Sequence, residues 1–174
     1  MNRFAILIVS IGSALFAQDQ PPRSLNDALL EKMTGKWTLT GTLLKQNATH
    51  CVTAKWVLNH QFLEIHEKDA AAQPAYEAIV LVGWDGVSER YVAHWIDIFG
   101  GRTSETIGYG IRSGDRIEFR LEYPDGPFLT TFHWSPEHGE WQWLMRTKNK
   151  SGQWEEFGNM NLARQAGTRP DESN

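Results

Sequence analysis

Cysteine is nearly absent from the sequence. Cys51 is the only one among 174 residues, so no disulfide bond can form within the chain. It lies far from the N-terminus, which excludes the lipid-anchor cysteine that follows some signal peptides. No clear basic context around it would favour a thiolate. We interpret Cys51 as a small residue in a strand.

The sequence also lacks clusters of charge of one sign. It carries 17 Lys and Arg against 21 Asp and Glu, a net charge of −4, and the basic residues are scattered. Proteins that bind nucleic acid or anionic membranes concentrate positive charge on one surface. We therefore expect neither nucleic acid nor an anionic membrane as partner.

Only one apolar run is long, and it stands at the N-terminus. Phe4 to Phe16 follows Arg3 and is interrupted by Ser10, Gly12 and Ser13 alone. Its 13 residues are too few to span a bilayer and match the hydrophobic region of a signal peptide. We predict a signal peptide over residues 1–17, a linker over 18–24, and a periplasmic or secreted protein without membrane insertion after cleavage. A buried N-terminal helix is the alternative.

Motifs of common catalytic and metal sites are missing as well. The sequence has no GxSxG nucleophile motif, and its six histidines form no HxH or HExxH pattern. Gly108-Tyr109-Gly110 lacks the following helix that a phosphate-binding loop needs. We accordingly assign no catalytic residue and predict no metal site.

The most informative segment that is present runs from Tyr76 to Asp97. Large apolar residues alternate along both of its halves, and Asp85-Gly86 between them is typical of a turn. Bulky residues occur on both faces of each half. That pattern is expected where a sheet closes round an interior, so the segment predicts an antiparallel hairpin of a barrel.

The rest of the chain continues the same pattern. Ser24 is placed to cap a short helix, Leu25–Met33, that ends at Gly35. Short aromatic and β-branched runs follow, separated by turn residues, and with the hairpin they make about ten strands. These further strands are expected at 36–44, 49–58, 61–68, 102–111, 116–123, 128–134, 140–147 and 153–163. We predict one all-β domain over 25–164, an antiparallel up-and-down barrel, and a disordered tail over 165–174.

Several residues are candidates for the lining of a ligand cavity. Asp97 shares a strand face with Trp95 and stands near the strand end, so it fits either the cavity rim or a local backbone turn. Arg146 faces inward if Trp141 and Trp143 face outward, and it could then hold a carboxylate group. The alternative is a solvent-exposed Arg146, because it lies close to the turn over residues 148–152. The candidate ligand-binding set is Trp84, His94, Trp95, Asp97, Phe119, Phe132, His133 and Arg146.

Two stretches resemble known barrel proteins. Leu30 to Trp37 (LEKMTGKW) looks like the Gly-x-Trp opening of lipocalin-like barrels. The hairpin is similar to the central hairpin of a bacterial family of calycin-like barrels, domain of unknown function 1579, through Gly83-Trp84-Asp85 and Trp95-Ile96-Asp97. Residues 123–131 and 152–164 also look like segments of that family, so the resemblance extends over about 29–164.

What the resemblance implies is an exported antiparallel barrel without an assigned reaction or ligand. Related calycin-like barrels bind haem or hydrophobic small molecules, and His133 is the candidate axial ligand for a haem. No other cofactor is expected. The leading hypothesis is a barrel that binds an apolar or amphipathic small molecule. The alternatives are an enzyme that uses Asp97 with His94 or His133, and a structural or interaction barrel filled by its own side chains.

Overall fold

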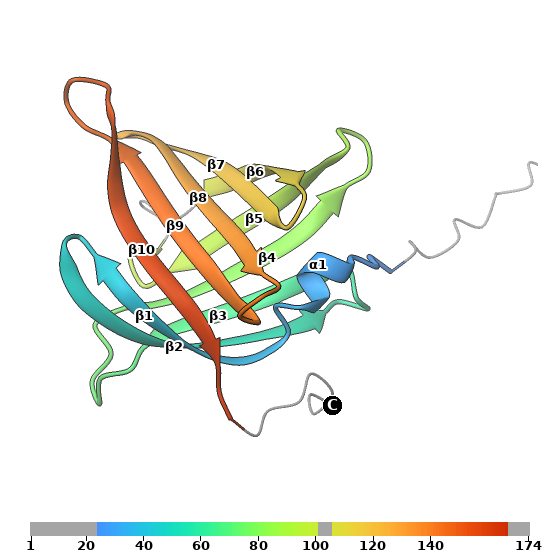
Figure 1. The fold of residues 1–174 in the computed structure, drawn as a ribbon. Helices are drawn as coiled ribbons and strands as arrows, with labels where there is room; N and C mark the ends of the chain where they lie inside the picture. Colours follow the sequence, from blue (N-terminus) through green and yellow to red (C-terminus); the bar gives the residue numbers. More distant parts are fainter. Residues whose placement is uncertain (1–23, 101–105, 167–174) are drawn as a thin grey trace, which may run out of the picture.

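Ten antiparallel strands close into a single barrel in the computed structural model of the chain, which describes residues 24–100 and 106–166 (Figure 1). This confirms the predicted all-β, up-and-down barrel. The elements are α1 (Ala28–Glu31), β1 (Gly35–Leu43), β2 (Gln46–Val57), β3 (Phe62–Asp69), β4 (Glu77–Asp85), β5 (Arg90–Asp97), β6 (Thr106–Ser113), β7 (Arg116–Tyr123), β8 (Gly126–Ser135), β9 (Glu140–Lys148) and β10 (Trp154–Arg164).

Each strand pairs with its neighbour in sequence, and β1 pairs with β10 to close the sheet. The closing register runs from Trp37 opposite Arg164 to Leu43 opposite Gly158. Gly41 lies within this seam, where a Cβ atom would stand 2.2 Å from the Asn159 carbonyl oxygen. Only glycine therefore allows the two strands to approach this closely.

Large apolar side chains fill the interior around the middle of the strands. Trp37, Trp141 and Trp143 are fully buried, as are Phe119 and Leu121 of β7. The ring of Trp143 packs against Phe132 at 4.7 Å and Trp95 at 5.7 Å between centroids. Packed aromatic rings thus form the centre of this core, among buried aliphatic residues of neighbouring strands.

Helix α1 closes one end of the barrel (Figure 1). Leu29, Leu30 and Met33 are buried, as the predicted apolar face requires. The indole Nε1 of Trp37 donates to the Met33 carbonyl at 2.7 Å, and Arg164 Nη1 donates to the Thr34 carbonyl at 2.9 Å. Strands β1 and β10 thus hold the helix and the barrel seam together.

The helix is shorter than expected, and its cap is a different residue. It spans only Ala28–Glu31, and Asp27 rather than Ser24 accepts hydrogen bonds from the backbone N–H groups of Leu29 and Leu30. Asp27 also accepts a hydrogen bond from the Tyr91 hydroxyl and one from Arg112. Because barrel residues hold the Asp27 carboxylate, tertiary contacts determine where the helix begins.

The turn of the β4–β5 hairpin also differs from its prediction. Asp85 accepts hydrogen bonds from Val87 and Ser88 N–H, as expected of an Asp turn. The residue with positive φ, however, is Glu89 at 52°, and not Gly86. The turn therefore extends over four residues, since β4 ends at Asp85 and β5 begins at Arg90.

The predicted segments at the two ends of the chain lie mostly outside the described residues. The predicted signal peptide, nearly all of the linker and residues 167–174 lie outside the described residues. Gln165, which we had assigned to the tail, donates its N–H to the Lys36 carbonyl at 3.0 Å and so extends the β1–β10 contact. No helix within the described residues is long and apolar enough to cross a membrane.

Replacement of Asp27 by Ala should lower the free energy of unfolding by about 2 kcal/mol, because the helix cap is lost and the Tyr91 hydroxyl loses its acceptor. Urea denaturation measures this loss. Glu137→Ala, at an exposed carboxylate in the β8–β9 turn, is the control and should change stability little. Equal effects of the two substitutions would contradict the assigned role of Asp27.

Candidate functional site

A buried ion pair interrupts the apolar inner wall at the end of the barrel opposite α1, which we call the distal end. His50 of β2 and Glu67 of β3 are each 5% exposed, and His50 Nδ1 lies 2.6 Å from Glu67 Oε1. Their neighbours on the inner face are Val52, Ala54 and Ile65. Since Val52 pairs with Glu67, the two polar residues are diagonal neighbours across the strands.

The pair favours the charged form of His50. The hydrogen bond that His50 donates to Glu67 raises the pKa of His50, burial opposes the rise, and the charges of Glu67 and Asp69 reinforce it. A buried ion pair loses much hydration and often adds no net stability. The position of this pair in an otherwise apolar wall therefore calls for an explanation other than stability.

Tyr76 and Trp95 lie beside the ion pair. The Tyr76 ring is centred 6.1 Å from the His50 ring, and its hydroxyl accepts a hydrogen bond from Trp95 Nε1 at 3.2 Å. Burial and the nearby negative charge of Glu67 raise the pKa of the Tyr76 hydroxyl well above its ordinary value. Tyr76 therefore stays protonated and can donate a hydrogen bond.

Asp97 completes a row of inward-facing residues. Ala78 of β4 pairs with Glu67 on one side and with Asp97 of β5 on the other. Asp97 is half-buried, and its Oδ1 accepts a hydrogen bond from the Phe99 N–H at 3.0 Å. Asp97 thus makes the local backbone turn, which is one of its two interpretations, and its side chain also stands on the inner face at the distal end.

The opposite side of the distal end is apolar and aromatic. Tyr123 of β7, Phe128 of β8 and Phe157 of β10 are partly buried and pack on the core. Tyr123 and Phe128 have centroids 6.0 Å apart, and Phe128 and Phe157 are 5.2 Å apart, both in edge-to-face contact. We call these three residues the aromatic rim. The distal end thus combines polar groups on β2–β5 with the aromatic rim on β7–β10.

One nitrogen of His50 has no partner within the described part of the chain. Glu67 holds Nδ1, whereas Nε2 makes no hydrogen bond there. A carboxylate that fixes one imidazole nitrogen orients the ring and leaves the other nitrogen available to a ligand or a proton. With Nδ1 held by Glu67 and Nε2 without a partner among the described residues, the His50 ring is arranged as in histidines that bind a ligand.

A second pair of the same kind lies outside the barrel. His66 Nε2 and Glu77 Oε1 are also 2.6 Å apart, but both side chains are more than one-third exposed on the outer faces of β3 and β4. Lys68 lies 3.5 Å from Glu77 as well. This outer pair offers a matched control for the buried one.

Of the predicted site residues, four face the interior, and only two of these contribute to the distal end. Trp95 and Asp97 do, whereas Phe119 and Phe132 belong to the packed core. Trp84 has the inward parity but stands at the α1 end, where it is 44% exposed and packs against Tyr91. Trp84 is therefore far from the candidate site.

The remaining three predicted residues lie on the outside. His94 packs against Phe62, and His133 is exposed on β8. Arg146 points outward because Trp141, Trp143 and Met145 fill the interior, and its guanidinium lies 3.1 Å from Glu118.

These placements bear on two hypotheses, the enzyme that uses Asp97 with His94 or His133 and the haem site at His133. Strands β5 and β8 are three strands apart, which alone separates His94 and His133 by roughly 14 Å, and the register offsets the two residues further along the strands. Neither outward histidine can work with the inward Asp97 on one bound molecule. His133 likewise cannot serve as an axial ligand inside the barrel.

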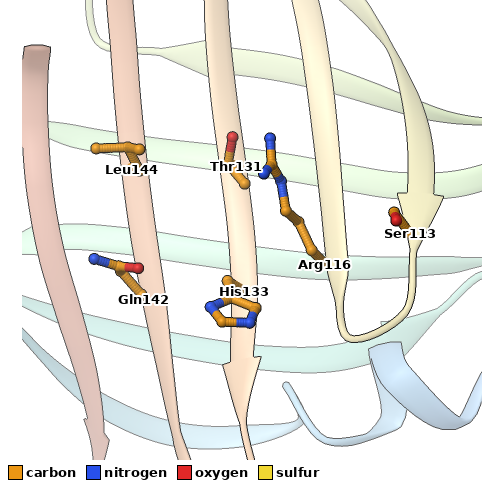
Figure 2. A pocket seen from close by; sticks show the side chains of 6 residues that line it. All are labelled: Ser113, Arg116, Thr131, His133, Gln142 and Leu144. Atoms are coloured by element: carbon orange, nitrogen blue, oxygen red, sulfur yellow. The ribbon is translucent and has the colours of Figure 1, made fainter.

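A groove of about 260 Å³ does exist beside His133, on the outer faces of β6–β9 (Figure 2). It is lined by Ser113, Arg116, Thr131, His133, Gln142 and Leu144. Glu118 accepts hydrogen bonds from Arg116, Arg146 and Thr131, so the two arginines already have a partner. Within the described residues, no group of three or more His, Cys, Asp or Glu side chains is placed to hold a metal ion.

Sequence reasoning missed His50, Glu67 and Tyr76 as site residues. The signal was present, since His50 alternates with Cys51 and shares the parity of Val52 and Ala54. Glu67 likewise continues the row of Leu63 and Ile65. A charged residue that continues an apolar row on each of two adjacent strands predicts a buried pair.

A scan against models of known protein families finds no match to this chain, and a search of curated proteins finds no relative. The resemblance to the family of unknown function therefore stays a prediction.

The raised pKa of His50 predicts a pH-dependent stability. Protonated His50 contributes fully to the free energy of unfolding below the unfolded-state pKa of about 6.5. This contribution is lost as the pH rises through the higher folded-state pKa. The free energy of unfolding should thus fall as the pH rises above about 6.5, and His50→Gln should reduce that fall. Urea denaturation at a series of pH values below and above about 6.5 measures it, with His66→Gln as control. An unchanged pH dependence in His50→Gln would contradict the assignment.

Proposed function

We propose that the barrel binds a small amphipathic molecule at its distal end. The observation that carries the proposal is the buried His50–Glu67 pair, whose free imidazole nitrogen lies in a wall opposite the aromatic rim. Small-molecule sites are typically apolar and contain a few convergent polar groups that fix the orientation of the ligand.

The chemistry of the residues defines the class of ligand. A charged His50 and a protonated Tyr76 both donate hydrogen bonds, so they favour a ligand with a carboxylate, sulfonate or carbonyl oxygen. The aromatic rim suits a ring or a short hydrocarbon chain. Ligand size is limited because Trp143, Phe132 and their neighbours fill the middle of the barrel. We therefore expect about one ring system rather than a long acyl chain.

The cellular setting is part of the same proposal. Arg3 and the apolar run after it support export through a signal peptide, and the mildly acidic composition gives no support to a nucleic-acid partner. The hairpin motifs and the barrel fold are in keeping with a lipocalin-like carrier of the bacterial family that the sequence resembles. The carrier would then work in the periplasm or outside the cell.

A second candidate function is acid–base catalysis at the same residues. It is favoured by the 2.6 Å contact that fixes His50 Nδ1 and leaves Nε2 free, which is the arrangement of a general base. Here the partner carboxylate is Glu67, and the histidines first considered, His94 and His133, have no role. Chemical change of a bound molecule would distinguish this function from carriage.

Titration with the fluorescent aromatic sulfonate 1-anilinonaphthalene-8-sulfonate tests the binding site. We expect saturable binding, and a loss of affinity of roughly tenfold in His50→Gln, because one charge-assisted hydrogen bond is removed. The matched control His66→Gln should bind as the native chain does. Near-ultraviolet circular dichroism establishes that both variants keep the fold. Equal affinity of both folded variants would overturn the assigned site.

Native mass spectrometry of the protein from its own source identifies a natural ligand. A co-purifying mass that stays unchanged on incubation supports a carrier, and one that is converted supports the enzyme. If no mass co-purifies and the sulfonate does not bind, the distal end is a filled structural end and the proposal fails.

A further inference from the structure

One wall of the barrel exposes far more apolar surface than the others. On the outer faces of β4, β5 and β6, and just past the end of β5, six large residues are between 37% and 77% exposed. They are Ile79, Ile96, Ile98, Ile107, Tyr109 and Ile111, and we call them the isoleucine face. Leu81 and Val92 lie among them and are half-buried.

The strand register makes these residues one continuous surface. Ile79 pairs with Ile96, Val92 pairs with Tyr109, and His94 pairs with Ile107. Ile96 is the diagonal neighbour of Ile107, within reach of its side chain. Figure 1 shows the three strands side by side. The face is therefore a patch and not a set of scattered apolar residues.

Other walls of the barrel have polar outer faces. Strand β7 presents Glu118, Arg120 and Glu122, and β1 presents Lys36 and a row of threonines. Monomeric proteins rarely expose a continuous apolar patch beyond a few hundred Å². The confinement of the exposed isoleucines to one wall indicates a contact surface.

We propose that the isoleucine face is the interface between two copies of this chain. The charges at its borders favour a second copy over a membrane. On one side of the face, Glu64 and Lys68 of β3 pair with Lys55 of β2 and Glu77 of β4. On the other side, Arg120 of β7 pairs with Glu122. Because both borders carry both signs, they are self-complementary under a two-fold axis, whereas an anionic lipid surface would require one positive sign.

The shape and area of the face fit this partner as well. Two convex barrel walls touch over only a few strands, and the face is three strands wide. With roughly 200 Å² for each large side chain, the exposed fractions give on the order of 600 Å² per copy. Two copies would bury about 1,200 Å², the lower limit of specific interfaces. We expect a dimer with a dissociation constant in the micromolar range.

Tyr109 and Arg90 show how polar groups border the face. The Arg90 guanidinium lies 3.4 Å from the centre of the Tyr109 ring and covers part of it. Tyr109 also pairs with Arg120 on the neighbouring strand. Aromatic and arginine side chains are enriched at protein interfaces, and here both lie beside the aliphatic residues of the face. This proposal does not depend on the distal-end ligand site.

Sedimentation velocity of the full chain from about 1 to 100 µM tests the proposal. The mass should rise with concentration from that of one chain, which is 19.8 kDa with the proposed signal peptide retained, towards twice that value. Ile96→Lys and Ile107→Lys should weaken association at least tenfold. Val87→Lys, in the β4–β5 turn outside the face, is the control and should leave it unchanged. A native chain that stays monomeric, or a dimer that the face substitutions do not weaken, overturns the proposal.

Hydrogen exchange of the unaltered chain gives a measurement that needs no variant. Amides of 77–85, 90–97 and 106–113 should exchange more slowly at 100 µM than at 1 µM, and those of β8 and β9 should not change. If protection rises elsewhere, or nowhere, the isoleucine face is not the interface. This outcome is decisive even where a lysine variant fails to fold.

Discussion

Closure of the sheet between β1 and β10 is the constraint on which the rest of the structure depends. Once the seam forms, each strand has an inner and an outer face, and a shift of one residue would exchange them. The seam is held by the Gly41 contact and by Trp37 and Arg164, which also fasten α1. Closure therefore determines the register of the barrel and also which of its ends is covered.

The two histidine–carboxylate pairs show how closure of the barrel buries one pair and leaves a similar pair exposed. His50–Glu67 and His66–Glu77 have the same contact of 2.6 Å and lie on adjacent strand pairs. The outer pair is exposed to solvent, and exposed ion pairs usually contribute little to stability. The inner pair has lost its water, and its unpaired imidazole nitrogen borders an end that α1 leaves uncovered. For this reason the inner pair is the centre of the proposed site.

Strand faces could be predicted where one side is charged. On β7 the row Glu118 and Arg120 leaves no doubt about the outer face, and the whole strand was placed correctly. The side on which Arg146 lies stayed open in the sequence because both faces of β9 carry large residues, so only the barrel packing decides between them. His50 and Glu67 were missed because a histidine or glutamate in a strand normally faces water. Their pairing becomes visible only when two strands are compared in register.

The role proposed for the distal end depends on a ligand that binds at His50. A crystal structure of the protein purified from its own source is the decisive measurement. We expect electron density for a bound molecule with an oxygen about 2.8 Å from His50 Nε2 and its apolar part against Phe128 and Phe157. An ordered distal end in which side chains of the chain itself occupy this space and pair with Nε2 would exclude such a ligand site.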